Sequence, residues 1–386
     1  MAVNFFLPWW LDNIYFCIKI ISVNINKEQV NKLSKLCVFC GQPPTDKNAE
    51  HVIPQWLMEL TGKKSRPCYL GNILDGKSIA FQAFKFPACE ECNSKYAKLE
   101  AVVKPIIVNI LDGKSVSAEN LHLLLDWFDK VRVGLWLGEL YMSKRIDEFS
   151  PHMHIDSRMG VKDRMLIVER VAPDAPNRRG LGFIGPSTDQ FLHNPCSFQL
   201  LINNYTFTSV SEYGLVARRL GFPYCNRMIR MSTEDVRANT IIRGTGRIQS
   251  PVVRSFTPTP EQTVIYQPIY RGLNQLSPDL YDAKYVIEHG LKPSDGIGGI
   301  FYQRGGRPAA YLAPGEQLNL TPRISSGDVY DMAVTHYQLH NYVTQNTYTT
   351  KFAPQEIQRN AQALTDFIVA LNNRSIEICK QMANQK

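Results

Sequence analysis

Two pairs of cysteines stand out as residues that could bind a metal. Each pair has two residues between its members, Cys37 with Cys40 and Cys89 with Cys92. Two cysteines on one tight turn supply two corners of a tetrahedron, and a second such turn supplies the other two. Four thiolates leave no open coordination position for water or substrate. The spacing therefore predicts one Zn²⁺ ion in a closed, structural site.

Residues that could take part in hydrolysis lie between and beside these pairs. The segment Glu50–Pro54 contains His51 and falls between the two pairs, and Asn93 directly follows the second pair. A histidine near its ordinary pKa accepts a proton from water at neutral pH. Carboxylate and amide oxygens are ligands that a hard divalent cation prefers. Because a zinc site would hold these residues together, the sequence indicates a second site that carries chemistry.

The order of these motifs resembles that of the HNH endonucleases. In that family a Cys-x-x-Cys pair precedes an acidic residue followed by His, two residues and Pro. An Asn before an apolar residue comes next, and then a second pair that ends Cys-x-x-Cys-Asn. This chain has every part in that order, with Asn72-Ile73 as the middle part. The resemblance covers about residues 37 to 100.

The resemblance implies a ββα-metal fold, similar to a treble clef, with one catalytic Mg²⁺ or Mn²⁺ between a hairpin and a helix. In such a site His51 would be the general base that takes a proton from the attacking water. Glu50 and Asn93 would hold the divalent cation, which neutralises the charge growing on the phosphate. Asn72 would position the loop that presents His51. The implied reaction is hydrolysis of DNA phosphodiester bonds.

The chain departs from the family pattern in three places. Glu50 stands where many members have Asp, so its carboxylate reaches one methylene further. Tyr96 replaces a lysine that often contacts phosphate, which leaves Lys95 and Lys98 as candidates for that contact. The stretch from about Leu60 to Phe84 is longer than in the compact family version. It must loop out, which costs little chain entropy.

Size and composition indicate more than a nuclease domain. The 386 residues predict a second domain, and 44% hydrophobic with 20% charged residues is typical of a globular protein. The net charge of +8 favours a polyanionic partner, which we expect to be double-stranded DNA. The five remaining cysteines show no paired spacing, which favours a reducing compartment and a cytoplasmic location.

The first 29 residues are partly apolar but lack the pattern of a membrane span or a signal peptide. Pro8, Asp12 and Lys19 interrupt the apolar run, and no basic residue precedes it. We therefore expect no contact with a membrane. Residues 1–29 are interpreted either as a short packed arm or as an over-extended translation start.

Residue periodicity predicts an α+β protein in two parts: a nuclease-like domain at 30–115 and a larger α+β domain at 116–386 that selects or senses the target. This second domain could also contact a partner protein or a second copy of the chain. The predicted elements are helices at 29–36, 94–103 (ending before Pro105), 117–142 and 357–378, and strands at 165–168, 198–202, 206–210 and 263–266.

An arginine-rich segment provides a second candidate surface for nucleic acid. Between Arg218 and Arg254 the chain has eight arginines and two acidic residues. Guanidinium groups suit phosphate contacts and stacking on bases. The arginines chosen as contacts are Arg218, Arg219, Arg227 and Arg230. The same pattern also fits a solvated face with internal ion pairs.

Two weaker motifs are interpreted as incidental. The segment Gly71–Ser78 matches the phosphate-loop pattern but lacks the strand before it and the helix after it. His336 and His340 lie one helical turn apart, but Tyr337 stands where a zinc protease needs Glu. We therefore expect ordinary helix-surface or core histidines.

Two other functions remain open. The four cysteines could form a zinc module that binds nucleic acid or protein without cutting it. Metal-dependent cleavage that is lost in His51→Ala would separate these two classes. A third possibility places the chemistry in residues 116–386, although no acid, base and nucleophile cluster there in the sequence.

Overall fold

The computed structural model describes residues 36–44, 46, 48–62, 67–70, 77–149, 151, 153–174, 180–186, 188–212, 224–225, 244–245, 258–269, 297–305, 307–347 and 355–384. The segment 1–29 and the helix expected at 29–36, except Leu36, lie outside these residues. The same holds for Asn72 and for all eight arginines between positions 218 and 254.

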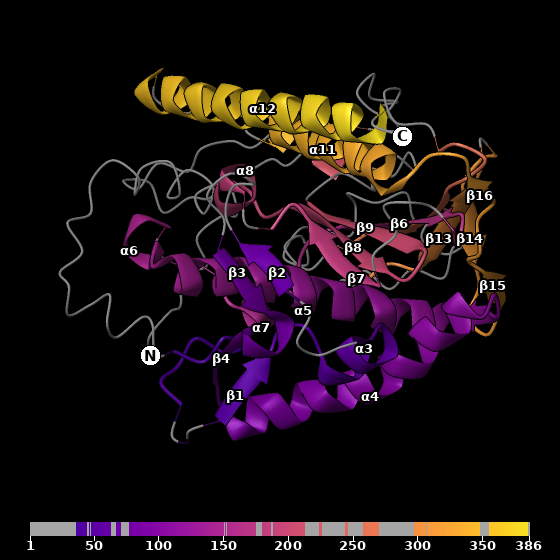
Figure 1. Ribbon diagram of the computed structural model, residues 1–386, viewed down its shortest axis with the longest axis horizontal. Helices are drawn as coiled ribbons and strands as arrows, with labels where there is room; N and C mark the ends of the chain where they lie inside the picture. Colours follow the sequence, from indigo (N-terminus) through magenta and orange to yellow (C-terminus); the bar gives the residue numbers. More distant parts are fainter. Residues whose placement is uncertain are drawn as a thin grey trace.

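The described residues form layers around a mixed sheet (Figure 1). Helices α11 (Val329–Thr347) and α12 (Gln355–Asn384) cover one face, and α5 (Ala118–Ser143) crosses the other. Helix α4 (Glu90–Leu111) lies beyond α5, beside the two-stranded hairpin of β1 (Asn48–His51) and β4 (Lys85–Ala88). The protein is therefore α+β, as the sequence predicted.

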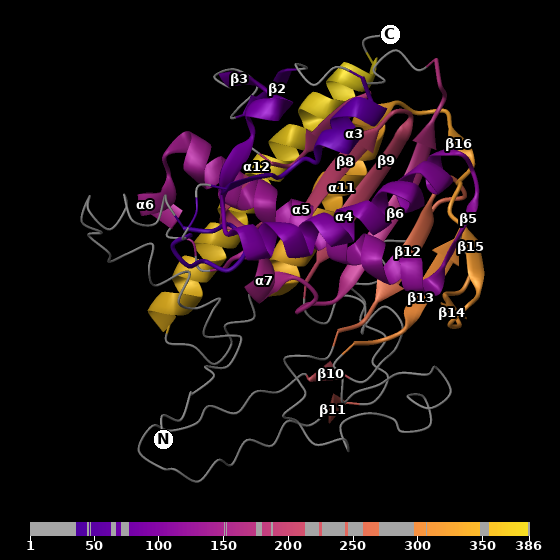
Figure 2. The ribbon, with the colours of Figure 1, turned by 90° about the horizontal axis from the view of Figure 1, so that it is seen from below.

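The central sheet has the order β14-β13-β12-β6-β9-β8-β7, and β16 pairs in parallel with β6 (Figure 2). These strands are β6 (Arg164–Val171), β7 (Leu181–Ile184), β8 (Ser197–Ile202), β9 (Tyr205–Ser211), β12 (Thr263–Gln267), β13 (Ile300–Arg304), β14 (Ala310–Leu312) and β16 (Ile324–Ser325). The four strands expected from the sequence are confirmed as parts of β6, β8, β9 and β12.

Strands β8 and β9 lie between β6 and the edge strand β7 of this sheet. The turn between them is Asn203-Asn204, and Asn203 has φ of 55°, which suits the tight turns that join right-twisted strands. Every residue of both strands is buried. Burial on both faces means that the helices on each side pack directly against the sheet.

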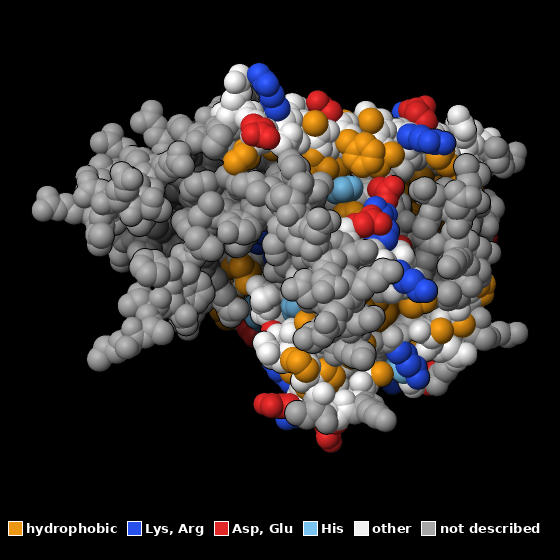
Figure 3. Space-filling model, turned by 90° about the vertical axis from the view of Figure 1, so that its left-hand side faces the viewer, with side chains coloured by type: hydrophobic (Ala, Val, Ile, Leu, Met, Phe, Trp, Pro, Cys, Tyr) orange, Lys and Arg blue, Asp and Glu red, His pale blue; other side chains and the backbone are white. Residues whose placement is uncertain are grey.

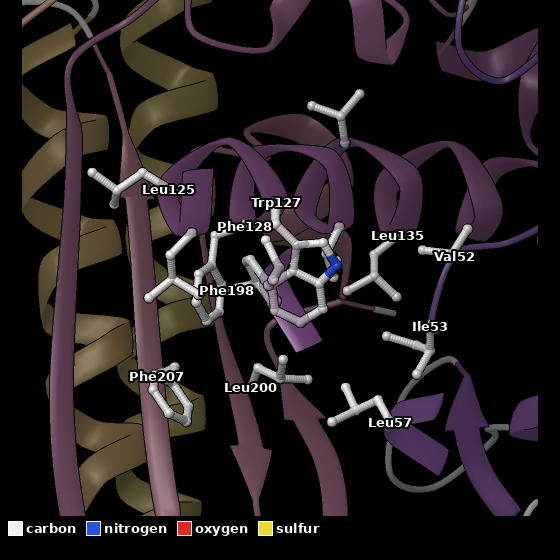
Figure 4. Close-up of a cluster of buried hydrophobic side chains, with 14 of the residues drawn as sticks. Val52, Ile53, Leu57, Leu125, Trp127, Phe128, Leu135, Phe198, Leu200 and Phe207 are labelled. Carbon is white, nitrogen blue, oxygen red and sulfur yellow. The ribbon is translucent and has the colours of Figure 1, made fainter. Parts of the chain in front are cut away.

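Helix α5 is the long buried helix that the sequence predicted. The Ser117 hydroxyl accepts a hydrogen bond from the Asn120 amide at 3.3 Å and caps its start, and Lys144 ends it in the left-handed conformation. Apolar side chains on one side of α5 meet the sheet, as Phe128 does at Phe198 and Phe207. On another side, Trp127 and Leu135 meet side chains of residues 52–57 (Figure 4). One hydrophobic core therefore runs from the cysteine pairs through α5 to the sheet.

Helix α4 corrects one sequence prediction. The helix expected over 94–103 was thought to end before Pro105, but it continues to Leu111 with Pro105 inside it. A proline in a helix costs about 3 kcal/mol. The next turn buries Ile106, Ile107 and Ile110, each worth about 1.5–3 kcal/mol. The burial of the three isoleucines outweighs the cost of placing Pro105 in the helix. Pro105 itself is exposed.

Helices α11 and α12, together called the helical cap, pack along each other on the sheet. Helix α12 begins just after Pro354, and its buried residues recur at helical spacing, which confirms the amphipathic helix expected at 357–378. In the end-on view, hydrophobic side chains gather along the top, where α12 lies (Figure 3). His336 and His340 are buried on α11, which confirms that they are core histidines.

The remaining elements are short. They are α3 (Gln55–Leu60), β2 (Pro67–Leu70), β3 (Lys77–Ala80), the 3₁₀ turn η1 (Phe81–Ala83), β5 (Ser115–Ser117), α6 (Ile146–Phe149), α7 (Ile155–Arg158), α8 (Asp189–His193), β10 (Tyr224–Cys225), β11 (Gly244–Thr245) and β15 (Gln317–Asn319). Strand β5 pairs with β15, at the boundary expected between the two domains. Among the described helices, none has the length and apolarity needed to cross a bilayer.

Candidate functional site

The four cysteines of the two pairs come together. The Sγ atoms of Cys37, Cys40, Cys89 and Cys92 all lie within 4.8 Å of one another. The first pair is on a turn before β1, while Cys89 caps the start of α4 and Cys92 lies in its first turn. This geometry fits a metal such as zinc, which takes four sulfur ligands in a tetrahedron.

The surroundings of the sulfurs also suit a bound cation. Burial raises the pKa of the Cys37 thiol, but hydrogen bonds from backbone amides, including that of Cys89 at 3.3 Å, outweigh it and hold the pKa below its ordinary value. Burial and the neighbouring Cys37 and Cys40 raise the pKa of Cys89 to about 12. Crowded thiolates repel one another, and a metal cation between them removes that repulsion.

A hairpin followed by a helix surrounds this cluster. Strand β1 pairs antiparallel with β4, so that Glu50 lies opposite Phe86 and His51 opposite Lys85. Helix α4 then begins directly after Cys89, with two acidic residues in its first turn that favour a helix N-terminus. The chain order around the cysteines is therefore strand, strand and helix, and the 29 residues between β1 and the 3₁₀ turn before β4 include α3, β2 and β3.

Strand β1 turns its residues to opposite faces. Asn48 and Glu50 face the helices, since they contact side chains of α4 and α5, and His51 is half-buried on the other face. Asn93 in α4 donates from Nδ2 to Asn48 Oδ1 at 3.3 Å. This bond ties the first turn of α4 to β1. The structure therefore places His51 and Glu50 on one strand and Asn93 on the helix attached to it.

Glu50 has a partner that the sequence analysis did not identify. Its Oε1 accepts a hydrogen bond from the Lys130 ammonium of α5, and the same ammonium bonds Glu100 Oε1 of α4. The side chain of Lys130 is 1% exposed, that of Glu50 9% and that of Glu100 17%. We call these three residues the carboxylate–lysine triad. It joins β1, α4 and α5 at one point beneath the hairpin.

The pKa values of Lys130 and Glu50 depend on burial and on the charged groups beside them. Burial lowers the pKa of Lys130, but Glu100 and Glu50 outweigh that effect and hold the pKa above its ordinary value, so the ammonium stays charged. Burial raises the pKa of Glu50, and Lys130 offsets only part of this rise. Two carboxylates share one ammonium. When both are ionised, the triad carries one net negative charge.

The two lysines predicted to contact phosphate lie in different environments. Lys95 pairs with Asp156 of α7 at 2.8 Å, while Lys98 is exposed. Tyr96 is buried between them: its ring stacks on Phe39 with centroids 4.3 Å apart, and its hydroxyl donates to Asp156. Tyr96 therefore fastens the first cysteine turn to α4 and α7. Asn72, Arg218, Arg219, Arg227 and Arg230 lie outside the described residues.

A signal for Lys130 was present in the sequence. The stretch from Leu121 to Leu140 reads as a buried helix, and a lysine inside such a helix needs acidic partners. The sequence did not indicate which acids these are. The phosphate-loop pattern agrees with its expectation only in part. Strand β2 does precede it, against the expectation, but Lys77 and Ser78 belong to strand β3, so no helix begins there.

Comparisons of this chain with family models, with curated proteins and with solved structures give no match. Any function therefore has to be argued from the site itself.

Proposed function

We propose that the protein is a zinc-stabilised endonuclease of the HNH type that hydrolyses DNA phosphodiester bonds. One observation carries this proposal: the hairpin β1–β4 and helix α4 surround the clustered cysteines and bring His51, Glu50 and Asn93 onto two elements joined by the Asn48–Asn93 hydrogen bond. Four cysteines would bind zinc and hold this scaffold. The zinc has no open position, so it takes no part in the reaction.

The roles of the chain's residues follow from their chemistry. His51 would accept the proton of the attacking water, since a neutral imidazole nitrogen is a suitable proton acceptor. Glu50 and Asn93 offer carboxylate and amide oxygens, which suit Mg²⁺ or Mn²⁺. Such an ion, when bound, supplies positive charge to the phosphate and the leaving oxygen. When both carboxylates are ionised, the net negative charge of the triad also favours a cation, although Lys130 already occupies Glu50 Oε1.

The proposed partner is double-stranded DNA, met in the cytoplasm. The support is the net charge of +8 and the exposed Lys98 on α4. Lys95 would contribute less, because Asp156 neutralises it. The arginines from Arg218 to Arg230 remain proposed contacts, and residues 116–386 the proposed part that selects the target or meets a partner protein.

Cleavage of a supercoiled plasmid by the full chain, with Mg²⁺, Mn²⁺ or EDTA, tests the proposal. We expect cleavage with a divalent ion and none with EDTA. His51→Ala should lower the rate by ~10²–10⁴ while zinc content and DNA affinity stay unchanged. His193→Ala, at a half-buried histidine of α8, is the matched control and should cut like the wild type. Equal cleavage by His51→Ala would contradict the assignment of the base.

A second function has its own support. The buried contact of Glu50 with Lys130 reduces the capacity of Glu50 to hold a metal, as expected for a zinc module that binds nucleic acid without cutting it. This second proposal predicts DNA binding with no cleavage under any ion, and equal binding by wild type and His51→Ala. The plasmid assay and a binding titration on the same samples separate the two.

A further inference from the structure

The position of Lys130 needs an explanation beyond packing. It lies in the middle of α5, with its ammonium 6.0 Å from the centre of the Phe39 ring and bonded to two carboxylates. Removing charges from water is costly, and a buried ion pair often stabilises a protein no better than apolar residues of similar size. A triad of this kind is therefore weak evidence for a purely structural role.

The two carboxylates hold Lys130 from different elements. Glu50 comes from β1, next to His51, and Glu100 comes from α4, two turns after Asn93. The ammonium thus reaches the gap between β1 and α4, where the resemblance implies a divalent cation. Two cations cannot approach the same carboxylate without repelling each other, and this repulsion is strong where water is excluded.

We propose that Lys130 competes with the divalent cation for the Glu50 carboxylate and so sets the ion concentration at which the catalytic site fills. This inference rests on the proposed function for the location of the ion site. Glu100 acts as the alternative partner of Lys130. When the ion binds Glu50, Lys130 keeps Glu100 and its charge stays paired.

The competition makes opposite predictions for two substitutions. Lys130→Met removes the competing charge and leaves two carboxylates facing each other, so the affinity for a divalent ion should rise at least about 10-fold. Glu100→Gln removes the alternative partner, so Lys130 holds Glu50 more firmly and the affinity should fall several-fold. A triad that only stabilises the fold would not shift the ion affinity in two directions.

Binding of Mn²⁺ alone, followed by electron paramagnetic resonance on the full zinc-loaded chain, measures these affinities without DNA. The set comprises wild type, Lys130→Met, Glu100→Gln, and Glu50→Gln combined with Lys130→Met. The double variant should lose the gained affinity, which assigns the site to Glu50. Lys104→Met removes an exposed lysine of α4 and should bind Mn²⁺ like the wild type.

Zinc content and a thermal melt establish that each variant folds. If Lys130→Met does not fold, Glu100→Gln decides, because its partly exposed side chain tolerates the change: weaker Mn²⁺ binding supports the competition, and unchanged or tighter binding overturns it. Unchanged affinity in a folded Lys130→Met also overturns it. Cleavage that persists in EDTA and depends on Lys130 would also overturn the competition, since the lysine would then take the place of the ion.

The cleavage assay keeps this inference separate from the proposed function. If Mn²⁺ affinities shift as expected and no variant cuts DNA, the competition stands and the nuclease proposal fails. If His51-dependent cleavage is found and the affinities do not shift, the nuclease proposal stands and the competition fails.

Discussion

The carboxylate–lysine triad beneath the hairpin and the histidine cluster under the helical cap bury polar groups in opposite ways. In the cap, His340 Nε2 donates to the Asn194 carbonyl at 2.7 Å, and its Nδ1 accepts from Asn372 Nδ2 at 2.8 Å. Both ring nitrogens are bonded, so the imidazole is neutral. Burial lowers the pKa of His340 to about 4 and that of His336 well below its ordinary value. In the triad, by contrast, the two carboxylates keep the buried Lys130 ammonium charged.

The difference concerns the cost of burying each kind of group. A neutral, fully bonded histidine satisfies the backbone and joins α11 to the end of α8 and to α12 at modest cost. Charged groups at similar depth cost much more to bury. This molecule accepts that cost where β1, α4 and α5 meet, and also where Arg132 and Arg164 pair with Asp129 between α5 and the sheet. The hairpin region, which comprises β1, β4, α4 and the four cysteines, is our candidate for chemistry because it also holds His51 and Asn93.

The largest test of this comparison removes the metal from the hairpin region. Cys89→Ser should lose zinc and unfold β1, β4 and α4, because a structural zinc supplies on the order of 10 kcal/mol of folding free energy in small modules. Metal analysis and limited proteolysis measure this. Cys379→Ser changes a buried cysteine of α12 and should retain one zinc per chain. A folded, zinc-free Cys89→Ser protein would show that the hairpin region needs no metal.

Acid should weaken the cap through His340. Its folded pKa of about 4 lies below the ordinary 6.5, so the unfolded chain binds more protons in this range. The contribution of His340 to the free energy of unfolding is therefore fully present above pH 6.5. It is lost as the pH falls towards 4, by at most about 3 kcal/mol. Urea unfolding at pH 7.5, 6 and 5 measures the slope.

The matched variant for this experiment is His340→Gln, which cannot take up a proton. Zinc release at low pH affects both proteins, so the difference between their slopes isolates His340. A shallower pH dependence in the variant is expected. Parallel slopes would mean that His340 does not control the acid sensitivity of the cap.

The packing contact between α5 and the hairpin region should tolerate little added volume. A Cβ atom at Gly138 would come 2.7 Å from ring carbons of Phe84 and Phe86, so Gly138→Ala should lower the free energy of unfolding by about 1–3 kcal/mol. At Gly182 in β7 a Cβ would meet Leu201 at an ordinary 3.9 Å. Gly182→Ala should therefore change the free energy of unfolding by less than ~1 kcal/mol. Equal effects of the two substitutions in chemical denaturation would show that the contact between α5 and the hairpin region is not tightly packed.

The smallest expected effect is at Pro105 in α4. Pro105→Ala restores a backbone donor in the helix and should stabilise the hairpin region by about 1 kcal/mol. Thermal melts of the zinc-loaded protein measure it. Lys104→Ala changes the neighbouring exposed side chain without altering the backbone and should be nearly neutral. A lower melting temperature in Pro105→Ala would show that the proline supports the helix as it is.

Much of this molecule was predictable where a local pattern carries the information. The spacing of two Cys-x-x-Cys pairs brought four sulfurs within 4.8 Å, because each tight turn fixes two ligands. Helical periodicity identified α5 and α12, and apolar runs identified β6, β8, β9 and β12. These patterns act over one or two turns or a single strand, so the amino-acid order alone determines them.

Only the tertiary structure decided which residues meet Glu50. Lys130 lies 80 residues after it in the chain and Glu100 lies 50 after it, and no local spacing links the three. The continuation of α4 through Pro105 was likewise decided by packing, since isoleucines further along the helix are buried in the shared core. The sequence by itself determined the cluster of four cysteines and the long elements. Folding determined the charge environment of the site, because burial and pairing depend on segments that meet only in three dimensions.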